Sequence, residues 1–438
     1  MVLLRNFANI FKIPELTKKI LFTLGVFIVF EIGRMIPAIG VNVSVLADLM
    51  KQQAAFSGFL SYFDTLSGGA LTQSTIFSLG ISPYITASIM MQMLSMTVPS
   101  LEAMMKEGDY GRRMINQYTR YVALALSIGY SFSYAMYLMR QNSMSVPGLV
   151  VSPGWGFVFL FTLSLTVGAI FVMWLGEQIS LFGIGNGSSM LIFAGIVSSF
   201  PSKFIMLLQI HPLKAMLTIA IFIIIAGLIV YLEKGERKIP VQYARRIIGQ
   251  RVYGGQSTYI PFKINTVGVM PVIFAGSLLN IPMFVVGMLA TRFVFLKVFA
   301  DALAYGGVLY SVLEFGLIIF FTFLYTAIAF NPTELADNIK KSGGFIPGIR
   351  PGKQTADYFD YILTRIGLVG AIYLGLLAVA PTIFLTGILR LPFVMSGTSL
   401  LIMVGVALET SAQIESYLIE YKYGSFLSSG RLKNRVGR

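Results

Sequence analysis

The chain has 438 residues, of which 56% are hydrophobic and only 12% are charged, and its mean hydropathy is +0.77. Soluble globular proteins have about a quarter of their residues charged, so this composition excludes that class and predicts a chain largely surrounded by lipid. The net charge is +14, and the absence of cysteine excludes disulfides, thiol catalysis and cysteine-bound metals.

Ten apolar stretches follow one another along the chain, and each is close to the length that crosses a hydrocarbon core of about 30 Å. They cover residues 20–37, 75–98, 121–139, 155–175, 184–200, 213–232, 267–289, 308–330, 366–385 and 398–418. The pattern predicts an all-α polytopic membrane protein with ten transmembrane helices. Because ten is even, both termini are expected on the same side of the membrane.

The distribution of basic residues predicts the orientation of these helices. The segments on the side of the termini contain 25 of the 33 Lys and Arg residues, and the opposite side contains 7. The positive-inside rule therefore places both termini in the cytoplasm. Five spans precede the middle of the chain and five follow it, so if the halves are structural repeats they would have opposite orientations and form an inverted pair.

A small, apolar segment lies between the first two expected spans, at residues 66–71. It is either a chance turn at the membrane interface or a re-entrant element, and its avoidance of water favours the second interpretation. Pro83, near the start of the second span, removes an intrahelical hydrogen bond. The backbone there is expected to be buried in protein or to face a water-filled cavity.

Ionisable residues inside the expected spans are few. They are Glu31, Arg34, Glu314, Glu409 and Glu415. Glu31 and Arg34 are one helical turn apart and are expected to pair on one helix face. No series of Asp, Glu or His crosses several spans to relay protons, which weakens a transporter interpretation. It does not eliminate one, since sodium sites can be built from carbonyls and hydroxyls.

Two cytoplasmic segments, residues 233–265 and 331–361, are too long to be simple connectors. Both combine Gly, Pro and β-branched residues with basic side chains, which predicts ordered protrusions. They are either solvated loops that anchor the topology or a docking surface for a partner. Their length and the repetition of basic residues favour a docking surface.

Eight short motifs then follow in order along nearly the whole chain, and each alone is weak. They are residues 68–71 (GGAL), 79–85 (LGISPYI), 107–113 (EGDYGRR), 117–121 (QYTRY), 183–187 (GIGNG), 256–258 (QST), 347–352 (PGIRPG) and 397–402 (GTSLLI). Together they resemble the SecY family of channel subunits of protein translocases, to which the channel subunit of the eukaryotic ER translocon is related.

The resemblance implies two inverted five-helix halves, residues 1–210 and 211–438, that form a clamshell around an hourglass pore. The family's pore-ring positions fall on Ile81, Ile85, Ser188, Ile192, Ile273 and Ile402. Branched aliphatic side chains at one level seal around a translocating peptide and disfavour continuous water. Without the motifs, these would be ordinary isoleucines of the spans. Ser188 departs from the family pattern, in which an aliphatic residue is usual.

The resemblance also implies a plug at about residues 59–73, on the non-cytoplasmic side of the ring. Its central residues are Leu66, Gly68, Gly69, Ala70 and Leu71. A lateral gate is expected between the second and third spans on one side and the seventh and eighth on the other.

The two basic loops would then bind partners, through Arg246, Arg251, Lys340, Arg350 and Lys353. Arg350 matches a family position that supports motor-driven transport, and Arg251, with Arg246 upstream, corresponds to a family arginine pair. The implied partners are SecE- and SecG-type small membrane subunits, the SecA motor ATPase, the ribosome with its rRNA, signal peptides and nascent polypeptides. Anionic lipids also suit the basic surface.

The expected function is a protein-conducting channel of the bacterial plasma membrane, which translocates unfolded secretory polypeptides and inserts membrane proteins laterally. The sequence has no Walker loop, metal cluster or nucleophile–base set, so neither enzymatic activity nor a cofactor is expected. The alternatives are a ten-helix secondary transporter, with polar groups converging at the midplane, and a membrane enzyme with a polar catalytic cluster.

Overall fold

The computed structural model describes residues 13–46, 64, 67–144, 147–210, 212–243, 246–248, 251–253, 257–290, 302, 307–385 and 396–429. The chain divides into two compact units. Unit 1 comprises the described residues within Met1–Ala54, Leu60–Phe200 and Val406–Arg438, and unit 2 those within Pro201–Gly405. The division into halves at residue 210 stays a prediction.

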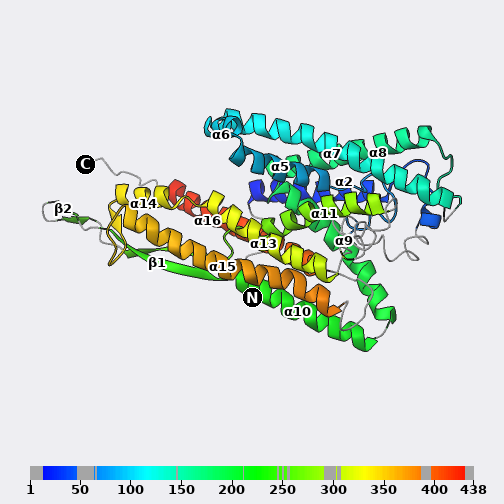
Figure 1. The fold of residues 1–438 in the computed structure, drawn as a ribbon. Coiled ribbons are helices and arrows are strands. Elements are labelled where there is room, and N and C mark those ends of the chain that lie inside the picture. Colours follow the sequence, from blue (N-terminus) through cyan, green and yellow to red (C-terminus); the bar gives the residue numbers. More distant parts are fainter. Residues whose placement is uncertain are drawn as a thin grey trace. The chain divides into compact units, whose positions relative to one another are not determined.

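Unit 1 is built from long apolar helices. They are α2 (Pro14–Met35), α5 (Ser82–Thr97), α6 (Pro99–Lys106), α7 (Asp109–Met144), α8 (Trp155–Phe182) and most of α9 (Gly187–Ile210). Helix α7 lies side by side with α8 and packs along α5, while α2 also contacts α8 (Figure 1). The last part of α16 (Gly397–Ser429) also belongs to this unit.

Unit 2 contains the remaining helices. They are α10 (Pro212–Lys234), α11 (Met270–Ala290), α13 (Val308–Ala329), α14 (Pro332–Lys341), α15 (Lys353–Ile383) and the first turns of α16. Helix α13 packs along both α15 and α11, and α10 packs on α15 (Figure 1). These contacts place α13 and α15 at the centre of the unit.

The two long loops meet in a small sheet of unit 2. The strands are β1 (Glu236–Tyr243), β2 (Arg246–Ile248), β3 (Arg251–Tyr253), β4 (Ser257–Lys263) and β5 (Gly344–Phe345). One antiparallel sheet has the order β4-β1-β5, with Gln242 opposite Phe345, and β2 pairs with β3 as a separate ribbon. Ile239 and Phe262 share a hydrophobic core with Phe359. The expectation of ordered loops is confirmed for their described residues. The all-α prediction did not include these strands.

Each of the ten expected spans overlaps a helix in the described part of the chain. Among the described helices, seven are long and apolar enough to cross a membrane by length and composition. Helix α2 is not one of them, because it carries Lys18, Lys19, Glu31 and Arg34, and α5 has only 16 residues. The polytopic helical fold is confirmed, whereas the number ten stays a prediction.

The second span begins later than expected. Helix α5 starts at Ser82, and residues 76–81 before it form turns. Pro83 therefore lies in the first turn, where its missing N–H leaves no intrahelical hydrogen bond unmade. The prediction that Pro83 interrupts a helix is wrong, because Pro83 lies at the beginning of α5.

Candidate functional site

The Gly-rich segment of unit 1 is folded back on itself by a set of hydrogen bonds. The Gly69 N–H donates to the Asp64 carbonyl oxygen at 2.7 Å, and the Thr72 N–H donates to Asp64 Oδ1 at 2.9 Å. The Thr75 N–H donates to the Ala70 carbonyl oxygen at 3.0 Å. One aspartate thus closes the turn from both sides, which fixes the shape of a segment with no regular secondary structure.

This segment is buried inside unit 1. Ser67 and Ala70 are each 1% exposed and Leu71 is 3% exposed, and the hydroxyl of Tyr134 on α7 donates to the Leu71 carbonyl oxygen at 3.2 Å. The burial supports a re-entrant element over a turn at the membrane interface. Leu66 and the expected plug residues 59–63 lie outside the described residues.

Gly68 and Gly69 have φ values of +71° and +92°, in the left-handed region that favours glycine. A Cβ atom at Gly68 would overlap the carbonyl oxygen of Gly195 on α9 and lie 2.8 Å from Arg34 Nη1. At Gly69 a Cβ atom would meet nothing within 4 Å. Gly68 is therefore the residue that packs the segment directly against α9.

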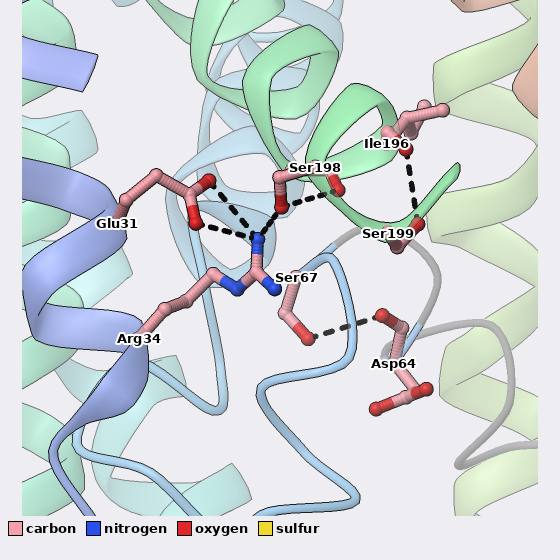
Figure 2. A network of polar contacts seen from close by, with 8 residues as sticks. Glu31, Arg34, Asp64, Ser67, Ile196, Ser198 and Ser199 are labelled. Atoms are coloured by element: carbon pink, nitrogen blue, oxygen red, sulfur yellow. Dashed lines mark hydrogen bonds and ion pairs between the residues drawn. The ribbon is translucent and has the colours of Figure 1, made fainter. Parts of the chain in front are cut away.

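Arg34 connects α2 to α9 beside this contact (Figure 2). Its Nη1 atom donates to Glu31 Oε1 at 3.0 Å and to Glu31 Oε2 at 3.1 Å, and it also donates to Ser198 Oγ. The Glu31–Arg34 pair expected from the sequence is confirmed. Ser198 was not predicted, because a serine 164 residues away from its partner gives no signal in a single sequence.

Three of the expected ring isoleucines belong to unit 1, together with Ser188. Ile81 immediately precedes α5, Ile85 lies one turn later, and Ile192 lies in the second turn of α9; they are 4%, 5% and 1% exposed. The Ile81 side chain lies close to Gly176 of α8, where a Cβ atom would come within 3.0 Å of Ile81 Cδ1. Gly176 thus leaves the space that this isoleucine occupies.

Ser188 lies in the first turn of α9 and forms hydrogen bonds with Asn186, immediately before that helix. Its N–H and its hydroxyl both donate to Asn186 Oδ1, at 3.1 and 2.6 Å, and the Ser189 N–H donates to the same atom at 3.4 Å. Side-chain oxygens at this position satisfy the free N–H groups of a helix start. Asn186 supplies the capping oxygen, and the Ser188 hydroxyl adds a hydrogen bond to that oxygen which an aliphatic residue could not make.

Ile273 and Ile402 belong to unit 2, and each is 2% exposed. Ile273 lies in the first turns of α11, and Ile402 lies in the second turn of α16. Helix α16 is capped by Ser396, whose Oγ accepts a hydrogen bond from the Ser399 N–H at 3.0 Å. A Cβ atom at Gly397 would lie 2.6 Å from the Leu377 carbonyl oxygen, so this glycine allows α16 to approach α15.

The PGIRPG motif presents Arg350 on a turn between β5 and α15. Gly348 and Gly352 have φ values of +84° and +105°, which only glycine adopts readily, and Thr355 Oγ1 donates to the Arg350 carbonyl oxygen at 2.9 Å. Arg350, Lys340 and Lys353 are all exposed. The two glycines and the Thr355 hydrogen bond thus fix the backbone of the turn, and the Arg350 side chain faces solvent.

Arg246 and Arg251 lie on the two strands of the β2–β3 ribbon. Arg246 is opposite Tyr253, and Arg251 is opposite Ile248. Their backbone is described, and their side chains lie outside the described residues. The ribbon places both arginines on one protruding element.

Two ion pairs stabilise α6, α7 and α8 at their polar ends. Arg120 Nε donates to Glu177 Oε1 at 2.7 Å and joins α7 to α8. Lys106 Nζ donates to Glu102 Oε1 at 2.6 Å, and this hydrogen bond holds the pKa of the Glu102 carboxyl below its ordinary value. In the described part of the chain, no group of three or more His, Asp or Glu residues is arranged to hold a metal ion.

Comparison with known proteins decides the family. The SecY family model matches residues 75–411. The chain belongs to the SecY family. The SecY protein translocase subunits of Aquifex aeolicus and Escherichia coli K12 are 42% and 43% identical to it over 426 and 427 residues. These alignments cover 95% and 96% of this chain, and 98% and 95% of the two relatives.

Solved channels have the same SecY fold. A protein-conducting channel matches with a TM-score of 0.65 at 18% identity, and a canine Sec61 from a ribosome–channel complex of the endoplasmic reticulum matches with 0.62 at 17%. A SecY protein whose plug domain stabilises the closed state matches with 0.60 at 19%. Each match covers 95% of both chains. Membership of the SecY family makes this chain a translocase channel subunit, and favours a channel over a secondary transporter.

Proposed function

We propose that this SecY-family chain conducts unfolded secretory polypeptides across the plasma membrane and releases membrane proteins laterally into the lipid. The observation that carries the proposal is the buried turn at residues 67–75, which packs against α9, the helix that also contains Ile192. A removable apolar segment beside a ring helix suits a channel that must be closed at rest. A transporter would instead need polar groups converging on a substrate.

The proposed seal is a ring of branched aliphatic side chains. Its members are Ile81, Ile85, Ile192, Ile273 and Ile402, with Ser188 at the sixth position. A ring of this kind can widen around any peptide. When no peptide is present, its apolar side chains disfavour a continuous column of water. It has no charge that would select among substrates, as a conduit for many sequences requires.

The proposed plug is the turn that contains Gly68, Gly69, Ala70 and Leu71. Asp64 and the backbone of the segment supply hydrogen bonds that hold its shape from within, in addition to the bond from Tyr134 of α7 to Leu71. Such a segment is able to leave the pore without unfolding. In the proposed orientation α2 and α9 both run outward, which places Arg34 near the non-cytoplasmic end of α2 and Ser198 near the non-cytoplasmic end of the expected span 184–200.

The proposed lateral gate opens between two pairs of helices. Helix α5 packs along α7 on one side, and α11 packs along α13 on the other. In each pair, the packed surfaces stabilise a rigid body. Separation of one pair from the other would open a path to lipid without breaking the packing inside either pair.

We place the two basic loops on the cytoplasmic side, together with both termini, as the distribution of Lys and Arg favours. Arg246, Arg251, Lys340, Arg350 and Lys353 would bind the SecA motor ATPase or the ribosome with its rRNA. SecE- and SecG-type subunits, signal peptides, nascent polypeptides and anionic lipids complete the proposed partners. The motor, the ribosome or the membrane potential would supply the energy.

The ring is tested by the ion conductance of the resting channel in planar bilayers. Replacing Ile81, Ile192 and Ile273 together with Ser is expected to raise the conductance severalfold, because hydroxyls hydrate the constriction. The matched control replaces the same three residues with Val, which keeps a branched aliphatic side chain and is expected to leave the conductance near wild type. Equal conductance in the two variants would show that these residues do not line the pore.

A further inference from the structure

Four residues of unit 1 form a cluster that joins three separate segments, and we name it the Arg34 cluster: Glu31, Arg34, Gly68 and Ser198. Figure 2 shows the Arg34 guanidinium between Glu31 on α2 and Ser198 on α9, with the turn at Ser67 beside it. Ser198 Oγ in turn donates to the Gly195 carbonyl oxygen at 3.5 Å. The carbonyl oxygen that accepts this bond is the same atom against which Gly68 packs.

The guanidinium of Arg34 is held in place and largely removed from solvent. The Arg34 side chain is 13% exposed and that of Glu31 is 30% exposed. Among the described residues, the buried Nε atom of Arg34 has no hydrogen-bond partner. A charge-assisted pair in such surroundings is strong, and loss of one member leaves an uncompensated charge. Arg34 therefore has one favourable position, between Glu31 and Ser198.

Gly68 packs so closely against the Arg34 guanidinium that no side-chain atom fits at this position. A Cβ atom there would lie 2.8 Å from Arg34 Nη1 and would overlap the Gly195 carbonyl oxygen. The surface on which the turn rests is thus made of one guanidinium and one carbonyl of α9. Gly195 is three residues after Ile192, so the turn, Arg34 and a proposed ring residue all meet on neighbouring turns of one helix.

We propose that Arg34 is a positioning residue that holds the 67–72 turn in its closed place against α9. Displacement of α2 relative to α9 would separate the guanidinium from Ser198 and remove the surface under Gly68. The turn would then be released with its internal hydrogen bonds to Asp64 intact. This inference rests on the proposed plug function, and it adds the contact that keeps the plug closed.

The test uses the accessibility of a cysteine in the turn, since the chain has no cysteine of its own. Leu71→Cys is introduced into the full-length channel in sealed membranes, and its reaction with a membrane-impermeant maleimide is timed from the non-cytoplasmic side. Adding Arg34→Met is expected to accelerate labelling about tenfold, the effect of losing one charge-assisted bond. Ion conductance of the resting channel is expected to rise in parallel.

Two further variants separate release from misfolding. Glu31→Gln with Arg34→Met leaves no unpaired charge in the cluster, and it is expected to fold normally and still label faster. Arg34→Lys keeps the charge but loses the planar fork, so its labelling is expected to lie between wild type and Arg34→Met. Arg113→Met, at an exposed arginine on α7, is the matched control and is expected to label at the wild-type rate.

A glycine pair provides an independent comparison. Gly68→Ala is expected to label faster than wild type, because its Cβ atom cannot fit against Gly195. Gly25→Ala, on α2 with nothing within 4 Å of the new atom, is expected to change nothing. Slow labelling in all Arg34 and Gly68 variants would overturn the inference and leave the plug proposal standing. Rapid labelling of Leu71→Cys alone would instead overturn the plug proposal itself.

Discussion

Glu314 places a carboxyl in the middle of the packed face of α13. It is 4% exposed, as buried as Ser311 on the same face and nearly as buried as Ile318 one turn later. Among the described residues, its Oε1 atom has no hydrogen-bond partner. A buried polar group without a partner costs free energy that an aliphatic side chain of similar size would not.

Glu314→Leu is therefore expected to stabilise the protein by about 1–3 kcal/mol, the usual cost of an unsatisfied buried group. The measurement is the thermal unfolding temperature of the purified channel in detergent. Glu409→Leu is the control, because Glu409 is exposed and its replacement removes no buried group. A lower unfolding temperature for Glu314→Leu would show that this carboxyl has a stabilising role.

At the scale of elements, hydropathy predicted where the long helices lie but not where they begin. Helix α7 begins at Asp109 and α15 at Lys353, well before the expected starts at residues 121 and 366. Hydropathy reports contact with lipid, whereas helical hydrogen bonds continue into water through polar residues such as Arg112 and Arg113. The start of α5 was predicted too early for the opposite reason, since residues 76–81 are apolar but form turns.

The PGIRPG turn allows a prediction about an element boundary. Gly352, immediately before α15, has φ +105° and ψ −133°, a conformation that other residues rarely adopt. Gly352→Ala is expected to cost about 1–3 kcal/mol, and to weaken partner binding by displacing Arg350. Gly316→Ala, at an exposed position of α13 with open space around it, is expected to be neutral or to stabilise by up to about 1 kcal/mol. Thermal unfolding and partner binding of both variants check this difference.

At the scale of the whole molecule, sequence reasoning predicted the class, the family and a helix at each expected span, because these depend on composition and on motifs in order. It did not predict contacts between distant segments. The pairing of Gln242 with Phe345 joins the two basic loops, and the contact of Arg34 with Ser198 joins α2 to α9. Short strands and single polar residues have no periodic pattern, so only the folded chain reveals their partners.

The joining of both loops in one sheet leads to a prediction about docking. Strand β1 pairs with β4 of its own loop and with β5 of the other, and the common core includes Ile239, Phe262 and Phe359. Strands β1, β4 and β5 therefore join the two loops in one body, whereas Arg246 and Arg251 lie on the separate β2–β3 ribbon. Exposed arginines on this body are suited to bidentate bonds with the carboxylates of a motor or the phosphates of rRNA.

Arg350→Ala and Arg251→Ala are expected to leave membrane insertion and protein levels near wild type, because neither substitution removes a residue of the hydrophobic core. Arg350→Ala is expected to lose motor-driven transport more than motor binding, and Arg251→Ala to lose ribosome affinity. Both effects are measured on reconstituted channels at two salt concentrations. The wild-type affinities are expected to fall with salt, because exposed charges are screened over about 10 Å at 0.1 M. Arg140→Ala, an exposed arginine expected on the opposite side, is the control. Normal transport and binding in both loop variants would mean that the basic residues only fix the orientation of the chain.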